Sequence, residues 1–290
     1  MRDFTVKKYK ELITVLLKEG YKTISVGQAI PLNDIRDDEK IAIVRHDIDT
    51  RFDLPIALEM ASFENQNNVV ASYYFRTVPE TYDTSVMEKI RDLGHEIGYH
   101  YEVMSLAKGN EAEAMKRFIK DLEELRQICQ VKTICQHGGA MGHYNTTSLS
   151  GLMEIGWDYL RGKINRIEYY PSIKLWEKHK LEDYDLVGDA YLSLDFSIFK
   201  YFSDTGQRWD SHGTRILDSI QESEAYRNIT AKNTDDLIEL IRSDKIRYLN
   251  LLVHPANWND PFFSWLKWRI LQKVRNNLKK LYNPNVHYEY

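Results

Sequence analysis

Histidines and carboxylates follow four short apolar segments of the chain, each at the point where the segment ends. The segments cover residues 41–44, 96–99, 133–136 and 250–253. The polar residues that follow them are His46, Asp47, Asp49, His100, Glu102, His137 and His254. If the segments are parallel strands of one sheet, their carboxyl ends meet at one edge, where such folds bind ligands. The pattern therefore predicts one site assembled from four strands.

The residue types of this group are those that bind divalent metals. Asp47 and Asp49 are two residues apart, so an extended strand would point both side chains the same way. Two carboxylates that close repel each other unless a cation or a shared proton separates their roles. Aspartate with histidine is a common ligand set for Zn²⁺, and a catalytic metal keeps one position open for water. The alternative for both aspartates is a turn or a cap of the helix expected from Leu54.

Each histidine also has a structural alternative. His100 could be a satisfied core histidine, and His137, which two glycines follow, an ordinary turn residue. His254 precedes Pro255, which favours an extended backbone and suits a side chain directed at the end of the sheet. His95, at the end of a helical pattern, is expected to be structural.

Helical and strand patterns alternate along most of the chain. Apolar spacing predicts helices around residues 9–17, 54–63, 85–93 and 114–125, after Thr234 and after Pro261, and strands at 41–44, 69–75, 96–100, 131–135 and 248–253. This order predicts an α/β fold with a parallel sheet covered by helices, either open or closed into a barrel. No repeat or linker divides the chain. We expect a single domain over 1–290, with the motifs between about 40 and 260 and a C-terminal helix at about 261–283.

Composition excludes several classes of protein. The chain has 290 residues, 43% of them hydrophobic, and a formal net charge of −4, which argues against nucleic acid as the main partner. No apolar run approaches the ~18 residues of a membrane span. Two cysteines are too few for a disulfide framework or a zinc cage. No basic-then-apolar leader opens the chain, so a cytoplasmic location is expected.

Three segments together resemble the polysaccharide deacetylase family, also called the NodB-homology or carbohydrate esterase family 4 group. They are Arg45-His46-Asp47-Ile48-Asp49, Gly94-His95-Glu96-Ile97-Gly98-Tyr99-His100 and Leu252-Val253-His254-Pro255. They look most like a divergent branch with an HDxD first motif and an HEIGxHYE second motif. The resemblance implies a distorted seven-stranded (β/α) barrel with a divalent metal, expected to be Zn²⁺, at its carboxyl-terminal edge. It also implies hydrolysis of an N-acetyl group from a sugar.

Carried over by motif, the resemblance makes Asp47 the catalytic base and Asp49 a metal ligand. His100 matches the first histidine ligand, and His254 matches the histidine that protonates the leaving amine. The family's second histidine ligand, four residues after the first, is Met104 in this chain.

A thioether binds zinc poorly among hard ligands, so the third ligand must be rebuilt or the metal site is lost. His137, at the end of the adjacent predicted strand, and Glu102, two residues after His100, are the two candidates. His137 is favoured as the third ligand, and Glu102 is then expected to contact the substrate.

The family's third motif, an arginine followed by prolines, is absent at residues 136–140. Its arginine orients the catalytic base, and Arg208 is a candidate replacement. Trp209 is a candidate face for stacking a sugar ring, and Asp204, Arg208 and Trp209 are expected to bind substrate. The alternative is an ordinary polar turn with a buried tryptophan.

These residues predict a metal-dependent hydrolase that removes an N-acetyl group from an amino sugar or glycan precursor, with a role in surface polysaccharide biosynthesis. One alternative is a carbohydrate-binding protein of the same fold that has lost catalysis, because of Met104 and the missing arginine motif. The other is a metal-dependent phosphohydrolase built on His46 and Asp47. This alternative ranks lower because such His-Asp pairs usually lie on helices, and because no glycine-rich phosphate loop is near.

The C-terminal helix carries basic residues and no acidic ones between Trp265 and Lys280. It could lie on an anionic membrane surface. The favoured interpretation is that Leu266, Ile270, Val274 and Leu278 pack on the barrel and leave a solvated basic face.

Overall fold

The computed structural model describes residues 2–32, 38–138, 153, 161, 170–210, 224, 226 and 228–281. Helices and strands alternate through most of these ranges, as expected. The helices are α1 (Val6–Lys18), α2 (Val26–Ala29), α3 (Asp53–Gln66), α4 (Thr84–Asp92), α5 (Val103–Leu106), α6 (Glu111–Arg126), α8 (Thr234–Arg242) and α9 (Phe262–Leu281), with 3-10 turns η2 (Ser172–Glu177), η3 (Leu181–Tyr184) and η4 (Pro255–Asn257). The strands are β1 (Tyr21–Ile24), β2 (Lys40–Ile48), β3 (Ser72–Phe75), β4 (Glu96–Tyr101), β5 (Thr133–Gln136), β6 (Gly188–Asp189), β7 (Lys200–Ser203) and β8 (Tyr248–Val253).

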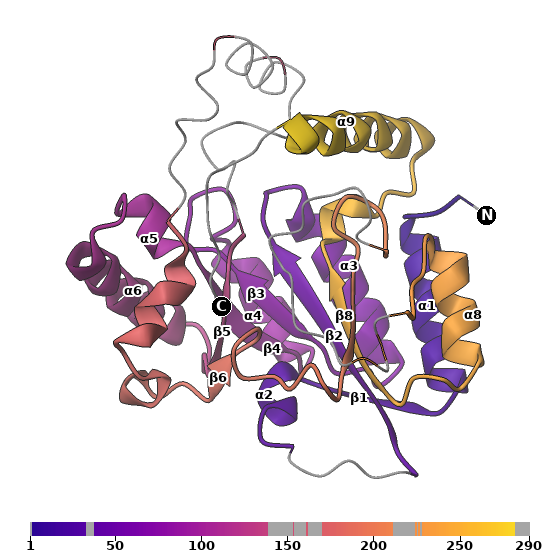
Figure 1. The fold of residues 1–290 in the computed structure, drawn as a ribbon, viewed down its shortest axis with the longest axis horizontal. Helices are drawn as coiled ribbons and strands as arrows, with labels where there is room; N and C mark the ends of the chain where they lie inside the picture. Colours follow the sequence, from indigo (N-terminus) through magenta and orange to yellow (C-terminus); the bar gives the residue numbers. More distant parts are fainter. Residues whose placement is uncertain are drawn as a thin grey trace.

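The strands form one parallel sheet in the order β6-β5-β4-β3-β2-β8-β7. β1 lies off this path and pairs in parallel with the first part of β2. β3 pairs with the later part of β2 along the same edge. The predicted α/β class with a seven-stranded parallel sheet is therefore confirmed. Within the described residues β6 and β7 do not pair with each other, so the curled sheet is not closed there. Figure 1 shows helices packed around it.

Two apolar cores lie on the two faces of the sheet, and β2 contributes to both. Ala42, Val44 and Ile48 face the larger core, which α1, α3, α4, α6 and α8 cover. Ile41 and Ile43 face the smaller core inside the curl. Successive strand residues point to opposite faces, so a strand buried on both faces reads as a continuous apolar run. β2 therefore shows no polar alternation until its carboxyl end.

α9 lies across the end of the sheet to which the strands run (Figure 1). The expected packing of its apolar stripe is wrong at two positions, because Leu266 and Ile270 are exposed rather than packed on the sheet. The helix is held instead by Trp268, whose Nε1 donates to Asn257 Oδ1 (3.1 Å), and by buried Leu271 and Gln272. No helix among the described residues is long and apolar enough to span a membrane.

Candidate metal and acid–base site

The predicted site residues of β2 lie on the inner face of the curled sheet. Along β2 this face carries Ile41 and Ile43, then Arg45 and Asp47, with Asp49 just beyond the strand. Apolar side chains thus fill the lower part of the curl and ionisable ones its carboxyl end. The period-2 alternation of a strand produces this ordered stack from one short sequence.

Three side chains at this end are placed to hold one cation. His100 Nε2 lies 3.2 Å from Asp49 Oδ1, and His137 Nε2 lies 3.7 Å from the same oxygen. The three donor atoms all lie within 4.8 Å of one another. In a tetrahedral zinc site with bonds near 2.0–2.1 Å, ligand atoms are about 3.3 Å apart. The distances of 3.2 and 3.7 Å from Asp49 Oδ1 lie near that value.

Asp49 supplies a second sign that a cation fits here. Its Oδ1 is buried and makes no hydrogen bond within the described part of the chain. An unsatisfied buried carboxylate oxygen is costly, and a bound cation would remove that cost. Although burial raises the pKa of Asp49, the three neighbouring histidines hold it well below its usual range. The carboxylate is therefore charged, as a metal ligand must be.

Hydrogen bonds fix which nitrogen each histidine presents. His100 Nδ1 is 2.9 Å from the carbonyl oxygen of Cys135, which can only accept, so Nδ1 carries a proton and Nε2 is the nitrogen left to bind a cation. His137 Nδ1 is 2.9 Å from Glu102 Oε2, which leaves Nε2 of His137 in the same role. Partners of this kind orient histidine ligands in metal sites.

Glu102, the other candidate for the third ligand, is occupied by these contacts. Its Oε1 accepts from the Arg76 guanidinium (Nε 2.9 Å), and its Oε2 accepts from His137. Although burial raises its pKa, His137 and Arg76 lower the pKa of Glu102 to about 2. The geometry therefore favours His137 over Glu102 as the third donor, with Glu102 placed to orient it.

A second group, made of Asp47, His100 and Cys135, also has donor atoms within 4.8 Å. Sequence reasoning missed Cys135 as a donor because it weighed the cysteines only as a pair. Both oxygens of Asp47 are bound by Arg45 in this structure. The group that contains Asp49 is therefore the better ligand set, because its carboxylate oxygen is unengaged.

Arg45 orients Asp47, a role that the sequence had suggested for Arg208. Arg45 Nε and Nη2 donate to the two oxygens of Asp47 at 2.9 and 2.7 Å, and both side chains are buried. Nη2 also donates to the hydroxyl of Tyr191 (2.7 Å), whose ring lies against the guanidinium. Although burial raises the pKa of Asp47, Arg45 and His100 lower it below the ordinary value. Asp47 is thus ionised and held in one orientation.

Arg208 pairs with a different carboxylate and does not orient Asp47. Its guanidinium donates to both oxygens of Asp210, at 2.9 and 2.7 Å, and its side chain is 44% exposed. The expectation for Trp209 is also corrected, because its ring is buried in the larger core and its Nε1 donates to Thr234 Oγ1 (3.0 Å). A buried indole offers no face to a sugar. The alternative of a polar turn with a buried tryptophan describes this segment.

His254 enters the site from the end of β8 and is held by Asp204. Its Nδ1 is 2.6 Å from Asp204 Oδ1, while its Nε2 lies 3.8 Å from Asp49 Oδ2. Asp204 is fully buried and also accepts from Trp258 Nε1 (2.7 Å), so it positions His254 and is closed to substrate. Burial lowers the pKa of His254, but Asp204 and the two site aspartates outweigh it and raise that pKa to about 10.

Asp53 lies beside this group and was missed by sequence reasoning. Its carboxylate accepts from the backbone N–H groups of Ala256 (2.7 Å) and Thr50 (2.8 Å), which ties the start of α3 to the turn after β8. Burial and the charge of Asp49 raise the pKa of Asp53 to about 6. A helix-start aspartate is a common pattern, so nothing in the sequence marked it as part of this region.

His46 faces away from all these residues. Its ring lies in the larger core, stacked on Tyr73, with Nε2 2.8 Å from Glu64 Oε1. His46 and Asp47 are neighbours in sequence but lie on opposite faces of β2. They therefore cannot act together as the His-Asp pair of a phosphohydrolase.

No family model matches the chain, and no curated protein does. Among solved structures, the chain is similar to a mutant of a CE4 family pseudoenzyme with restored enzymatic activity, with 12% identity and a TM-score of 0.41. That match covers 84% of this chain and 64% of the other, so the chain spans less than two thirds of its length. Leucoanthocyanidin reductase from Vitis vinifera, solved with NADPH, matches over 86% of this chain and 90% of its own, with 10% identity and a TM-score of 0.18.

Proposed function

We propose that this protein is a metal-dependent hydrolase that removes the N-acetyl group from an amino sugar or glycan precursor. The observation that carries the proposal is one arrangement of five side chains. Asp49, His100 and His137 converge as donors, with an ionised carboxylate, Asp47, on one side and a protonated imidazole, His254, on the other. Amide hydrolysis needs such a base, such an acid and an electrophile.

The cation that these donors would hold is proposed to be Zn²⁺, which Asp and His ligands suit. When bound, it acts as a Lewis acid on the amide carbonyl and lowers the pKa of water. Asp47 is the general base, because its carboxylate is charged and lies next to the donors, with Oδ2 3.6 Å from His100 Nε2. Arg45 keeps that carboxylate ionised and in place.

In the proposed reaction Asp47 accepts one proton and His254 donates one. Asp47 takes one proton from the attacking water, whose oxygen forms a bond to the carbonyl carbon. His254 gives its Nε2 proton to the amide nitrogen as the carbon–nitrogen bond breaks, which releases acetate and a free amine. Asp204, on Nδ1, keeps His254 protonated and directs Nε2 to the site.

Two observations support catalysis despite the departures from the resembled family. His137 lies within reach as a third donor in place of Met104, and Arg45 pairs with Asp47 as the missing motif arginine would. These replacements favour a working enzyme over a binding protein that has lost catalysis. We propose an intracellular amino sugar or a precursor of surface polysaccharide as the substrate.

Acetate release tests the proposal directly. Purified enzyme, with zinc added, is incubated with a panel of N-acetylated amino sugars and their oligomers, and separately with phosphoesters. We expect acetate from an N-acetylated substrate, loss of release in Asp47→Asn and His254→Ala, and full activity in a matched surface variant, His179→Ala. Phosphate release, or sugar binding without turnover by zinc-loaded protein, would contradict the proposal.

A further inference from the structure

α9 is an amphipathic helix whose inner side is firmly docked. Trp265 Nε1 donates to the carbonyl of Asp3 (2.7 Å), and Asn276 Nδ2 donates to the carbonyl of Gly206 (2.9 Å). Leu271 and Gln272 are buried between these points. The helix is thus attached along its length, and the orientation of its outer side is fixed by these contacts.

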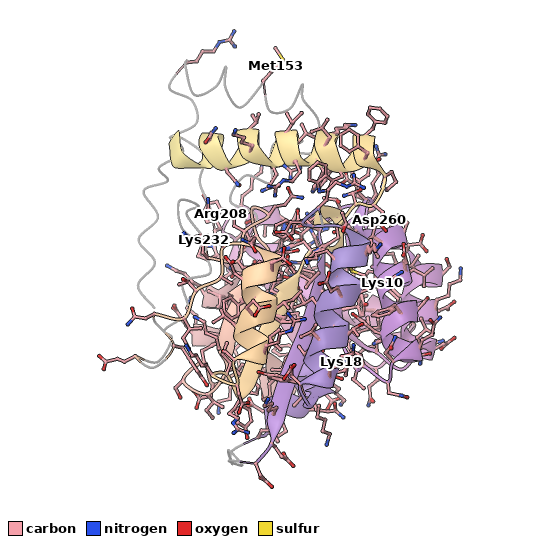
Figure 2. The ribbon with its side chains drawn as sticks, turned by 90° about the vertical axis from the view of Figure 1, so that its right-hand side faces the viewer. Lys10, Lys18, Met153, Arg208, Lys232 and Asp260 are labelled. Carbon is pink, nitrogen blue, oxygen red and sulfur yellow. The ribbon has the colours of Figure 1, made fainter. Side chains whose placement is uncertain are left out.

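The outer side of α9 is apolar and exposed. Phe263 is 82% exposed, Ile270 55%, Phe262 51% and Leu266 37%. The spacing of Phe263, Leu266 and Ile270 by three and four residues places them on one face. Figure 2 shows α9 lying across one end of the sheet and helix layers, with side chains projecting on the side away from them. An exposed apolar face on a docked helix indicates an interaction surface.

Phe52 packs against the inner side of α9 from the residue before α3. Its ring is 40% exposed and meets Trp268 edge-on, with ring centroids 5.9 Å apart. This contact adds to those that hold the helix in place.

The charges that α9 itself carries are all positive, although the exposed Asp260 lies just before its first residue. α9 carries six basic residues and no acidic one, in a chain whose net charge is −4. Lys267 and Lys273 are exposed beside the apolar face, and the guanidinium of Arg2 lies over the rings of Phe262 and Trp265. The partner that complements apolar side chains within a cationic border is an anionic lipid surface.

We propose that α9 docks this protein on the surface of an anionic bilayer, with the helix in the plane of the interface and its aromatic end inserted. A second copy of the chain fits less well, because a symmetric contact would bring two basic helices together. α9 also lies across the carboxyl ends of the strands (Figure 1), so docking turns the end of the molecule that carries the site toward the lipid.

The test is sedimentation of the full-length protein with two kinds of vesicle, phosphatidylcholine alone and phosphatidylcholine mixed with phosphatidylglycerol. We expect the protein to pellet with the anionic vesicles and to be released by salt. The double variant Lys267→Glu/Lys273→Glu should bind at least about 20-fold more weakly. Phe263→Ser/Ile270→Ser should also lose binding, because it removes the inserted side chains.

The matched control is Val187→Ser/Leu192→Ser, which removes two exposed apolar side chains away from α9. It should bind as the wild type does, and thermal melts should show that all the variants are folded. Wild-type protein that stays in the supernatant with anionic vesicles would overturn the proposal. Binding that the α9 variants leave unchanged would overturn it too, as would a dimer that Phe263→Ser disrupts in the absence of lipid binding.

Discussion

Two clusters of histidine and carboxylate lie on opposite faces of β2, and their chemistry differs. In the larger core, Glu64 accepts hydrogen bonds from Tyr9, from Tyr73 (2.7 Å) and from His46 (2.8 Å), and His95 lies 3.8 Å away. All five side chains are buried. At the carboxyl end of the sheet, the corresponding residues surround Asp49 Oδ1, which accepts no hydrogen bond from the described residues.

The difference shows that residue type alone does not make a metal site. The carboxylate of Glu64 is saturated by donors that are fixed in the core, so it stabilises the packing there. By contrast, Asp49 Oδ1 is unsatisfied within the described residues, and the Nε2 atoms of His100 and His137 lie 3.2 and 3.7 Å from it. A carboxylate oxygen without a hydrogen bond, with oriented imidazole nitrogens beside it, is the feature that indicates a metal site.

The largest expected effect comes from removing the unsatisfied carboxylate. Asp49→Ala should abolish both stoichiometric metal binding and acetate release, because no other carboxylate of the ligand set is free. Metal analysis and the acetate assay measure the two losses together. An Asp49→Ala protein that is still active without metal would contradict the assignment.

Glu64→Ala should produce the opposite result. The variant leaves the buried groups of Tyr9, Tyr73 and His46 without their acceptor, at a cost of about 1–3 kcal/mol for each unsatisfied group, so it should be markedly less stable to urea. In the fraction that stays folded, metal content should be unchanged. Loss of metal at full stability would show that the two clusters are not independent.

Glu102→Gln should have an intermediate effect on metal affinity. Loss of a partner that orients a histidine ligand typically weakens metal binding about 10–100-fold, and the amide keeps the shape of the carboxylate. Competition with a chelator measures the affinity. If Glu102→Gln lost metal entirely and His137→Ala kept it, the assignment of donor and orienting group would be reversed.

Asp204→Asn and Arg45→Gln should each narrow the pH–rate profile, the first from its alkaline side and the second from its acid side. His254 acts while protonated, and its pKa is raised by Asp204, so the neutral amide should shift the alkaline limb to lower pH. Asp47 acts while ionised, and its pKa is lowered by Arg45, so Arg45→Gln should shift the acid limb to higher pH. Unmoved limbs in kcat/KM would remove both groups from their assigned roles.

The smallest effect is expected for Arg208→Ala. Its side chain is 44% exposed and pairs with Asp210 rather than with Asp47, so acetate release should stay within about twofold of wild type. A large loss of kcat/KM would restore the role that the sequence had suggested for this arginine.

The strands of the parallel sheet and the convergence of their carboxyl ends could be predicted because both depend on patterns along single strands, whereas the strand order could not. The end of each apolar run marked where a side chain would enter the site. Arg45 could also have been found, since it lies two residues before Asp47 and a strand points both to the same side. The same alternation places His46 and Asp47 on opposite faces of the strand. The phosphohydrolase hypothesis, which used them as a pair, overlooked this.

The remaining errors concern contacts between distant segments. Trp209 stands in a polar turn, and nothing within that turn shows that Thr234 and the larger core receive its ring. In α9, the apolar stripe indicated a buried face, but tryptophan, glutamine and asparagine side chains provide the docking contacts. Local periodicity identifies the two sides of a helix, and tertiary contacts decide which side faces inward.

The central claim is that Asp49, His100 and His137 hold one divalent cation. The most direct measurement is metal content by mass spectrometry after zinc loading and desalting, for the wild type, His137→Ala and the surface control His179→Ala. The account predicts close to one zinc per chain in the wild type and the control, and none in His137→Ala. A wild type without metal, or a His137→Ala protein that keeps a full equivalent, would contradict it.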